Sequence, residues 1–276
     1  MRFTKYHALG NDYIVVDPKD LDSEITPCEV RALCDRHYGI GSDGILYGPL
    51  GSDSCDFALR IFNPDASEAE KSGNGLRIFS RYLWDSGLVG DLWFSIETMG
   101  GNVFASVYGS GAMVSVAMGK VGFTHEYGKF PALKAETIMA KNRPFEFYRA
   151  NVGNPHCVIP VDDLSPDLAK SYGKAIEEDK RFSNRTNVQF MRVVNRGTIQ
   201  IEIWERGAGY TLASGSSSTA SAAVAYALGL CDSQIAVKMP GGTIEVMIAE
   251  DFCAVMKGPV CKIGEGYLEN EALSAF

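Results

Sequence analysis

Length, composition and charge describe an acidic globular chain. It has 276 residues, 46% hydrophobic and 22% charged, with a formal net charge of −8, which is enough to bury one large core or two smaller ones. The acidic balance excludes the basic surface typical of nucleic-acid binding. No apolar run approaches the roughly 20 residues of a membrane helix, and polar sequence follows Phe3 without a signal-peptide core. We therefore expect a cytoplasmic protein with no nucleic-acid or membrane partner.

Cysteine and histidine spacing gives no metal or disulfide pattern. The seven cysteines are odd in number and scattered, without CxxC spacing, and the four histidines are equally dispersed. In a chain without an export signal this pattern predicts reduced thiols, and we expect no metal site.

The first half of the chain reads as short strands with two helices. We expect a helix from about residue 27 to 37, with Thr26 as its cap and Pro27 at its first position. Gly39-Ile40-Gly41-Ser42-Asp43-Gly44 formally matches GxGxxG, but it follows a helix and precedes a strand, the reverse of a dinucleotide site, so a plain loop is favoured. The expected strands are residues 3–7, 13–16, 45–47, 56–62, 93–98, 103–108 and 113–118.

Two serine-glycine turns organise the sequence. Ser72-Gly73-Asn74-Gly75 precedes an apolar run at 76–83, and Ser214-Gly215-Ser216-Ser217 precedes another at 220–228, 142 residues further on. A serine cap followed by small residues leaves backbone N–H groups free at a helix start, where the helix dipole also favours an anion. The pair suggests a duplicated half that presents two helix N-termini to one ligand.

Other landmarks recur at nearly the same offset. Gly10-Asn11 is answered by Gly153-Asn154 at 143 residues, Gly87 by Gly229 at 142, and Gly100 by Gly241 at 141. Strand and turn patterns that align loosely by chance are the alternative. We predict an α/β (α+β) fold of two pseudo-symmetric halves, each a mixed, mostly antiparallel sheet around a central helix. The halves are expected at 1–118 plus 263–276 and at 119–262, with the active site in the cleft between them.

Two equivalent turns suit one kind of chemistry. Inverting a carbon that bears hydrogen requires a base on one face and an acid on the other, while backbone N–H groups hold the adjacent carboxylate as charge builds there. The pattern therefore predicts a racemase, an epimerase or a proton-shifting isomerase.

The motifs resemble those of a known family. Residues 63–77, from Asn63-Pro64-Asp65 to Gly75-Leu76-Arg77, resemble the first signature of diaminopimelate epimerase, and Trp204-Glu205-Arg206-Gly207-Ala208-Gly209 with Ser214-Gly215-Ser216 resembles the second. Residues 7–13, 154–156 and 187–190 also fit, so the resemblance spans almost the whole chain. It implies a diaminopimelate epimerase-like fold and a cofactor-independent enzyme that interconverts LL- and meso-diaminopimelate for lysine and peptidoglycan supply. A homodimer is plausible by the same resemblance.

The resemblance also implies roles for individual residues. His156 and Glu205 are expected near the reacting carbon, and the Arg206 fork suits a carboxylate. A surface arginine, turn asparagines and a core histidine are the structural alternatives. The residues implied for the distal amine and carboxylate are Asn11, Asn63, Asn154, Asn187 and Arg206, and those implied for the carboxylate at the reacting carbon are Gly73, Asn74, Gly215 and Ser216, with Glu205 as a further binding residue.

One departure concerns the chemistry itself. The family has cysteine at both catalytic positions, where this chain has Ser72 and Ser214. A serine hydroxyl offers no anion comparable to a thiolate near neutral pH and needs another base beside it. Lys71, His156 and Glu205 are the candidates for that base.

Three interpretations follow from the two serines. They are an engineered Cys→Ser variant, a diverged racemase or proton-shifting isomerase of the same fold that uses other acids and bases and acts on another small acid, and a non-catalytic amino-acid-binding protein. Residues around the serines differ as well, including Lys71 and Ser216-Ser217-Ser218-Thr219, which favours a natural variant. We predict an isomerase acting on diaminopimelate, with the two-base roles at Ser72 and Ser214.

Overall fold

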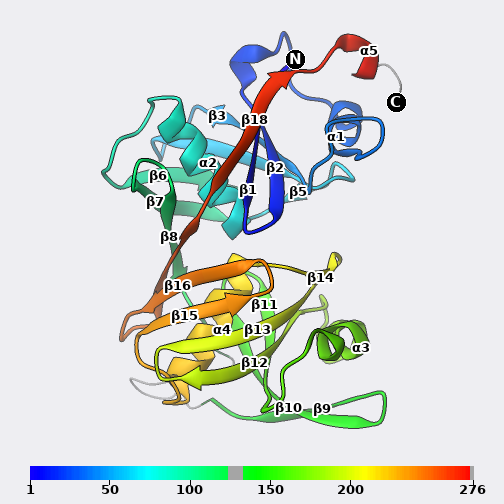
Figure 1. Cartoon of the computed structure of the whole chain (residues 1–276), viewed down its shortest axis with the longest axis vertical. Coiled ribbons are helices and arrows are strands. Elements are labelled where there is room, and N and C mark those ends of the chain that lie inside the picture. Colours follow the sequence, from blue (N-terminus) through cyan, green and yellow to red (C-terminus); the bar gives the residue numbers. More distant parts are fainter. Residues whose placement is uncertain (124–132, 274–276) are drawn as a thin grey trace. The chain divides into compact units, whose positions relative to one another are not determined.

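The computed structural model describes residues 1–123 and 133–273. The chain forms two compact units (Figure 1). Unit 1 contains Met1–Val116 and Gly258–Phe276, and unit 2 contains Ala117–Lys257. The boundaries predicted from the sequence lie two residues later at the first crossing and five residues later at the second.

Unit 1 is a mixed sheet with a central helix. Its helices are the 3-10 turn η1 (Pro18–Asp20), α1 (Pro27–Cys34), α2 (Gly73–Asp85) and α5 (Asn270–Leu273). Its strands are β1 (Arg2–Ala8), β2 (Asn11–Val16), β3 (Ile45–Leu50), β4 (Phe57–Phe62), β5 (Glu68–Ala69), β6 (Phe94–Thr98), β7 (Gly101–Tyr108), β8 (Met113–Lys120) and β18 (Cys261–Tyr267). The chain leaves unit 1 within β8.

Most neighbouring strands of unit 1 are antiparallel. The order is β18-β1-β2-β3-β4-β6-β7-β8, and only β2–β3 and β4–β6 run parallel among these pairs. β5 adds to the side of β4. The outermost pair joins distant parts of the sequence, because Arg2 lies opposite Tyr267.

Unit 2 has its own sheet and helices. Its helices are α3 (Pro166–Glu177) and α4 (Gly215–Ala227). Its strands are β9 (Glu136–Ala140), β10 (Arg143–Asn151), β11 (Pro155–Pro160), β12 (Asn187–Asn195), β13 (Thr198–Glu205), β14 (Gly209–Thr211), β15 (Gln234–Met239), β16 (Gly242–Ile248) and β17 (Cys253–Pro259), within which the chain returns to unit 1.

The two units have the same topology. The order in unit 2 is β9-β10-β11-β12-β13-β15-β16-β17, with β11–β12 and β13–β15 parallel and the other pairs antiparallel. β14 adds to β13 as β5 adds to β4. The predicted fold class is therefore confirmed, and the duplication extends from four landmarks to every strand of the sheets.

The central helices α2 and α4 lie against their own sheets. α2 contacts β1, β2, β3 and β7, while α4 contacts β10 to β13, β15 and β16. Both are 13 residues long and end alike, because Gly87 and Gly229 adopt φ values of 69° and 71° just beyond the helix, where the left-handed conformation favours glycine. Small side chains let α4 pack closely on all sides, since Ala220, Ala222 and Ala223 are fully buried.

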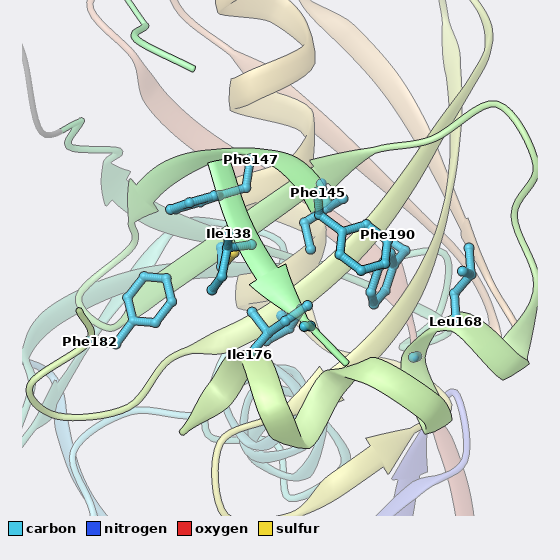
Figure 2. Packing of buried hydrophobic residues seen from close by; sticks show 12 residues of the cluster. Ile138, Phe145, Phe147, Leu168, Ile176, Phe182 and Phe190 are labelled. Atoms are coloured by element: carbon cyan, nitrogen blue, oxygen red, sulfur yellow. The ribbon is translucent and has the colours of Figure 1, made fainter. Parts of the chain in front are cut away.

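A second apolar layer of unit 2 packs beneath α3. Figure 2 shows Phe145, Phe147 and Phe190 of the strands gathered with Ile138, Ile176 and Phe182 around this helix. In unit 1, α1 covers the equivalent layer, where Ile14, Val30, Leu33 and Ile45 are buried. Each unit therefore packs a second apolar layer in addition to its central helix.

Two expectations for α1 and the loop after it can be compared with the structure. The helix begins as predicted, because Thr26 and Glu29 form a reciprocal capping box. It ends at Cys34 rather than about residue 37, since the Asp35 carboxylate accepts hydrogen bonds from the next backbone N–H groups, at His37 (2.7 Å) and Tyr38 (2.8 Å). The glycine motif at 39–44 is a loop between α1 and β3, as expected.

Membrane-spanning helices and clusters of metal ligands are both absent from the described residues. Within residues 1–123 and 133–273, no helix is both long and apolar enough to cross a membrane. The same residues contain no cluster of three or more His, Cys, Asp or Glu side chains that could hold a metal ion.

Candidate active site

Ser72 caps the start of α2. Its backbone is extended, and its Oγ accepts the N–H of Gly75 at 3.1 Å. Gly75 lies so close to its surroundings that a Cβ there would stand 3.0 Å from Leu46. The predicted turn therefore exists as a tightly packed helix N-terminus, with the partial positive charge that such a terminus carries.

Asn11 and Asn74 meet beside this turn. The Asn74 Nδ2 donates to Asn11 Oδ1 at 2.9 Å, and Asn11 Nδ2 donates to Asp43 Oδ2 at 2.8 Å. Asp43 in turn pairs with Arg36 at 2.7 Å. Two residues predicted from different parts of the sequence are thus locked together, and each amide orients the other.

Asn63 has different partners within unit 1. It follows β4, where its Nδ2 donates to Ser67 Oγ at 3.0 Å and its backbone groups bond with Ser67 and Ala66. This is the local side-chain and backbone bonding typical of a turn asparagine. Its predicted role as a substrate-binding residue stays a prediction.

A buried cation lies one turn into α2. Arg77 is fully buried, and its Nη2 donates to Asn74 Oδ1 at 2.5 Å. Burial lowers the pKa of Arg77 to about 10, so the guanidinium remains charged at neutral pH. Together with the helix dipole it favours a negative ligand at the turn. The burial of Arg77 was not predicted from the sequence, where Arg77 is only part of a motif. A single arginine within a helix gives no indication that its side chain is buried.

Tyr13 was missed by the sequence analysis, which placed it in a strand. Its hydroxyl lies 3.2 Å from Ser72 Oγ, within hydrogen-bonding distance. Lys71, the candidate base next in sequence to Ser72, is half-buried, and burial lowers its pKa below the usual lysine value. Ser72 therefore has a phenol in direct contact.

Ser214 caps α4 in the same way. Its Oγ accepts the N–H of Ser217 at 3.4 Å, and Ser217 Oγ accepts from Gln189 Nε2 at 3.0 Å. Asn154 Nδ2 lies 3.5 Å from Ser216 Oγ. The pair repeats the geometry of unit 1, since the residue two positions after each capping serine bonds to the equivalent asparagine.

His156 lies beneath this second turn. Only 1% of it is exposed, and its Nε2 donates to Asn154 Oδ1 at 2.9 Å. Its Nδ1 has no hydrogen-bond partner among the residues that the structure describes. Burial, reinforced by the positive charge of Arg206 and opposed by the Gln189 side chain, lowers the pKa of His156 to about 3. The ring is therefore neutral at neutral pH, and it orients Asn154.

The remaining predicted residues meet near the end of β13. Asn187 Nδ2 donates to the Pro155 carbonyl at 3.0 Å, while Asn187 Oδ1 accepts the backbone N–H of Arg206 at 3.0 Å. The Arg206 side chain is exposed, and its Nη1 donates to the Asn184 carbonyl at 3.2 Å. Glu205 is half-buried at the last position of β13. Glu205 immediately precedes Arg206 in the sequence.

Glu177 holds this segment in place and was also missed. Its Oε1 accepts from the Gly207 N–H at 2.9 Å and from Arg185 at 3.1 Å, while its Oε2 accepts from Trp204 Nε1 at 2.8 Å. The carboxylate is 4% exposed. Because Glu177 bonds on both sides of Glu205 and Arg206, it sets the course of the loop that carries them.

Each unit thus presents a serine-capped helix N-terminus with an amide donor beside it. Backbone N–H groups at such a terminus bind carboxylates and stabilise developing negative charge. Each of these turns can therefore bind a carboxylate.

Several solved structures have a similar fold. A probable proline racemase from Agrobacterium radiobacter K84 aligns with a TM-score of 0.72 at 16% identity, covering 97% of this chain and 92% of that chain. A hydroxyproline epimerase from Agrobacterium vitis gives 0.71 at 15% identity, covering 96% and 91%. A methylitaconate-delta-isomerase gives 0.65 at 13%, covering 99% and 97%. The fold is that of these racemases, epimerases and isomerases.

Sequence similarity identifies the family within that class. The family model described as diaminopimelate epimerase matches residues 3–124 and 148–263. "Diaminopimelate epimerase 2" of Nostoc sp. strain PCC 7120 is 56% identical over 275 residues, covering 98% of this chain and 96% of that protein. The diaminopimelate epimerase of Azoarcus sp. strain BH72 is 38% identical over 280 residues, covering 98% and 99%. The chain belongs to the diaminopimelate epimerase family and is an isomerase.

Proposed function

We propose that this isomerase interconverts LL- and meso-diaminopimelate by moving a proton at one α-carbon, without a cofactor. The observation that carries the proposal is the repeated turn, in which a serine-capped helix N-terminus lies beside an amide, Asn11 with Asn74 in one unit and Asn154 with Ser216 in the other. The relatives named diaminopimelate epimerase support this substrate.

The reaction needs a group that removes the α-proton from one face and a group that returns a proton on the other. We assign these roles to Ser72 and Ser214, so residues of both units are required. The backbone at Gly73 and Gly215 stabilises the negative charge that builds on the adjacent carboxylate. Each capping oxygen already accepts a backbone N–H, so one of its two lone pairs is occupied.

The distal end of the substrate has its own binding group. We assign the distal carboxylate to Arg206, whose guanidinium is exposed and whose backbone is fixed by Asn187. Asn63, Asn187 and Glu205 complete the proposed contacts with the distal amine and carboxylate. A planar guanidinium binds a carboxylate through two parallel hydrogen bonds, which selects a diacid over a simple amino acid.

His156 and Lys71 differ in how well each could act as the additional base. A buried histidine with a pKa of about 3 is a weak base, so His156 is better suited to orienting Asn154. Burial brings the pKa of Lys71 down toward the range in which an amine accepts a proton. We keep His156 as a positioning residue and Lys71 as the candidate base.

A second function follows from the two serines. Without thiols the chain can grip an amino acid through the same amides and helix N-termini and leave it unchanged. The intact set of asparagines and Arg206 favours a diaminopimelate-like ligand for this binding role also.

Proton NMR in D2O distinguishes the two functions. The protein as it stands is incubated with LL-diaminopimelate while the α-proton signal and the meso form are followed. We expect loss of the α-proton signal together with appearance of the meso form. If nothing changes, Ser72→Cys and Ser214→Cys are introduced together. Recovered epimerisation would identify a binding protein that lacks only its thiols, and continued silence would refute diaminopimelate as the substrate.

Assembly and location are proposed on weaker grounds. The family resemblance supports a homodimer, and composition supports a cytoplasmic protein. Light scattering behind a sizing column tests the first, because a homodimer has twice the mass of the chain. Fractionation of cells that express the full chain tests the second.

A further inference from the structure

Ser72 shares its hydroxyl with a buried phenol. The Tyr13 hydroxyl lies 3.2 Å from Ser72 Oγ, and either oxygen can donate. Tyr13 belongs to β2 and is 8% exposed, so its ring is held by the core of unit 1. The backbone of Gly44 makes room for it, because a Cβ at Gly44 would stand 2.7 Å from Tyr13 Cε1. The packing around the ring therefore positions the phenol hydroxyl beside Ser72.

Counting hydrogen bonds at Ser72 Oγ shows what this contact can do. A serine hydroxyl has one proton to donate and two lone pairs that accept. One lone pair already accepts the Gly75 N–H at 3.1 Å. When Tyr13 donates to the second, the Ser72 proton is left for the substrate. When Ser72 donates to the phenolate of Tyr13, the second lone pair is left to receive a proton.

The phenol also makes the proton transfer easier in energy. A phenol is a far stronger acid than an aliphatic hydroxyl, which needs an activating partner. A serine linked to a phenol can therefore pass its proton to a partner that ionises more readily than a second aliphatic hydroxyl would.

We propose that Tyr13 is a relay residue that acts through Ser72 in place of the missing thiol. In one direction the α C–H bond breaks, its electron pair stays on the substrate, the proton joins Ser72 Oγ and the Ser72 proton passes to the phenolate of Tyr13. In the other direction Ser72 protonates the carbanion while Tyr13 returns a proton to Ser72. One proton moves in each direction, and no oxidant or reductant is required.

The second turn does not repeat this arrangement. At the same offset as Asn11 and Asn154, the position of Tyr13 is occupied by His156, whose Nε2 bonds to Asn154. Ser214 Oγ receives the Ser217 N–H, as Ser72 Oγ receives that of Gly75, and Ser217 Oγ bonds to Gln189. The relay is thus specific to the first turn.

The contact between Tyr13 and residue 72 can be tested without any substrate. In Ser72→Cys protein, the pH dependence of alkylation by iodoacetamide gives the pKa of the thiol at position 72, with peptide mass mapping to separate it from the native cysteines. Ser72 is partly exposed, so the reagent has access. A phenol that donates to the thiolate lowers its pKa. Adding Tyr13→Phe should therefore raise that pKa by about 1, whereas Tyr148→Phe, which removes a phenol of unit 2, should leave it unchanged.

The relay itself is tested by turnover and rests on the proposed function. With serine at 72, Tyr13→Phe should slow α-proton exchange of diaminopimelate at least about tenfold. With Ser72→Cys it should slow exchange far less, because a thiol ionises without help. Thermal unfolding checks that the loss of one oxygen has left the fold intact.

The outcomes separate this inference from the proposed function. An unchanged thiol pKa at position 72, or an equal rate loss with serine and with cysteine, overturns the relay even if the protein is an active epimerase. A raised thiol pKa in a protein that never exchanges the α-proton overturns the proposed function, and with it the relay chemistry, while the contact between Tyr13 and residue 72 stands. A raised pKa together with a rate loss confined to the serine form supports both.

Discussion

Serine in place of cysteine changes the acidity of the two capping side chains. Ser72 and Ser214 keep the position and the hydrogen bond of a helix cap, at 3.1 Å and 3.4 Å, so the exchange preserves geometry and changes acidity. The side chains around each serine then matter more than they would around a thiol. Tyr13 contacts the first serine, while Ser217, Gln189 and Asn154 surround the second turn.

Substitution of Arg206 tests its proposed role in substrate binding directly. We expect Arg206→Ala to weaken binding of diaminopimelate at least about a hundredfold, since a charge-assisted bidentate contact contributes roughly 3 kcal/mol. The fold should remain intact because the side chain is exposed. Isothermal titration calorimetry measures the affinity. Arg196→Ala is the matched control, an exposed arginine paired with Asp232, and near-normal affinity of the Arg206 variant would remove it from the site.

His156 should make stability depend on pH. Its pKa is about 3 in the folded chain against an ordinary 6.5, so below pH 6.5 the unfolded chain binds a proton that the folded chain does not. The free energy of unfolding is then expected to fall by up to about 1.4 kcal/mol per pH unit from this group, until the pH nears 3. Urea unfolding at pH 7.0, 5.5 and 4.5 measures the slope.

A neutral replacement isolates that histidine. His156→Gln should flatten the slope between pH 6 and 4.5, whereas His37→Gln, at an exposed position, should leave it unchanged. A slope that is the same in the His156 variant as in the unmodified protein would show that other groups cause the loss of stability.

At the scale of elements, α3 packs close to the sheet because residue 173 is glycine. Gly173 faces Trp204 of β13, and a Cβ there would stand 2.4 Å from the indole Cγ. Trp204 cannot simply turn away, because its Nε1 donates to Glu177 at the end of the same helix. The close approach of α3 thus supports the carboxylate that holds the loop at Glu205 and Arg206.

This packing predicts how adding a methyl group at position 173 changes the stability of unit 2. In a helix Gly→Ala ordinarily stabilises by up to about 1 kcal/mol, but Gly173→Ala should instead destabilise unit 2 by about 1 to 3 kcal/mol through overpacking. The midpoint of urea unfolding measures it, with Lys174→Ala on the exposed side of α3 as the control. A midpoint equal to or above that of the unmodified protein would contradict the packing.

Sequence reasoning succeeded where local chemistry determines local structure. Ser72 and Ser214 cap helices, Thr26 begins α1, and Gly87 and Gly229 end α2 and α4, because each depends on a few neighbouring residues. Their regular spacing was enough to predict the duplication and the fold class.

The missed features depend on distant partners. β18 contains Gly264 and Gly266 and pairs with β1 some 260 residues earlier, so its own sequence is a weak strand signal. Glu177 looks like a solvated helix residue until Trp204 and Gly207 of a later hairpin meet it. Tyr13 looks like an ordinary core aromatic, because only the fold brings its hydroxyl to Ser72.

At the scale of the whole molecule, the two units are built from the chain in different ways. Unit 2 is one continuous stretch, Ala117–Lys257, and its outer pair β9–β10 is a hairpin. Unit 1 needs two stretches, because β18 comes from the far end of the sequence and pairs with β1.

Isolated halves should therefore behave differently. We expect residues 117–257 alone to unfold cooperatively in urea, with a free energy of unfolding of the order of 5 kcal/mol, because the sheet and both helices are present. Residues 1–116 alone should show no cooperative transition, since the outer edge of β1 lacks β18. Circular dichroism during urea titration measures both, and a cooperative transition in the shorter N-terminal piece would refute the dependence on β18.

The pairing of Arg2 with Tyr267 also orders events during synthesis on the ribosome. The N-terminal strand pairs with β2 on one side, but its other edge has no partner until β18 has been translated, and contacts so distant in sequence form slowly. Unit 2 can complete its sheet while the outer edge of β1 is still unpaired. During that interval the outer edge of β1 is an unpaired strand edge, which chaperones can cover, and pairing with β18 closes it.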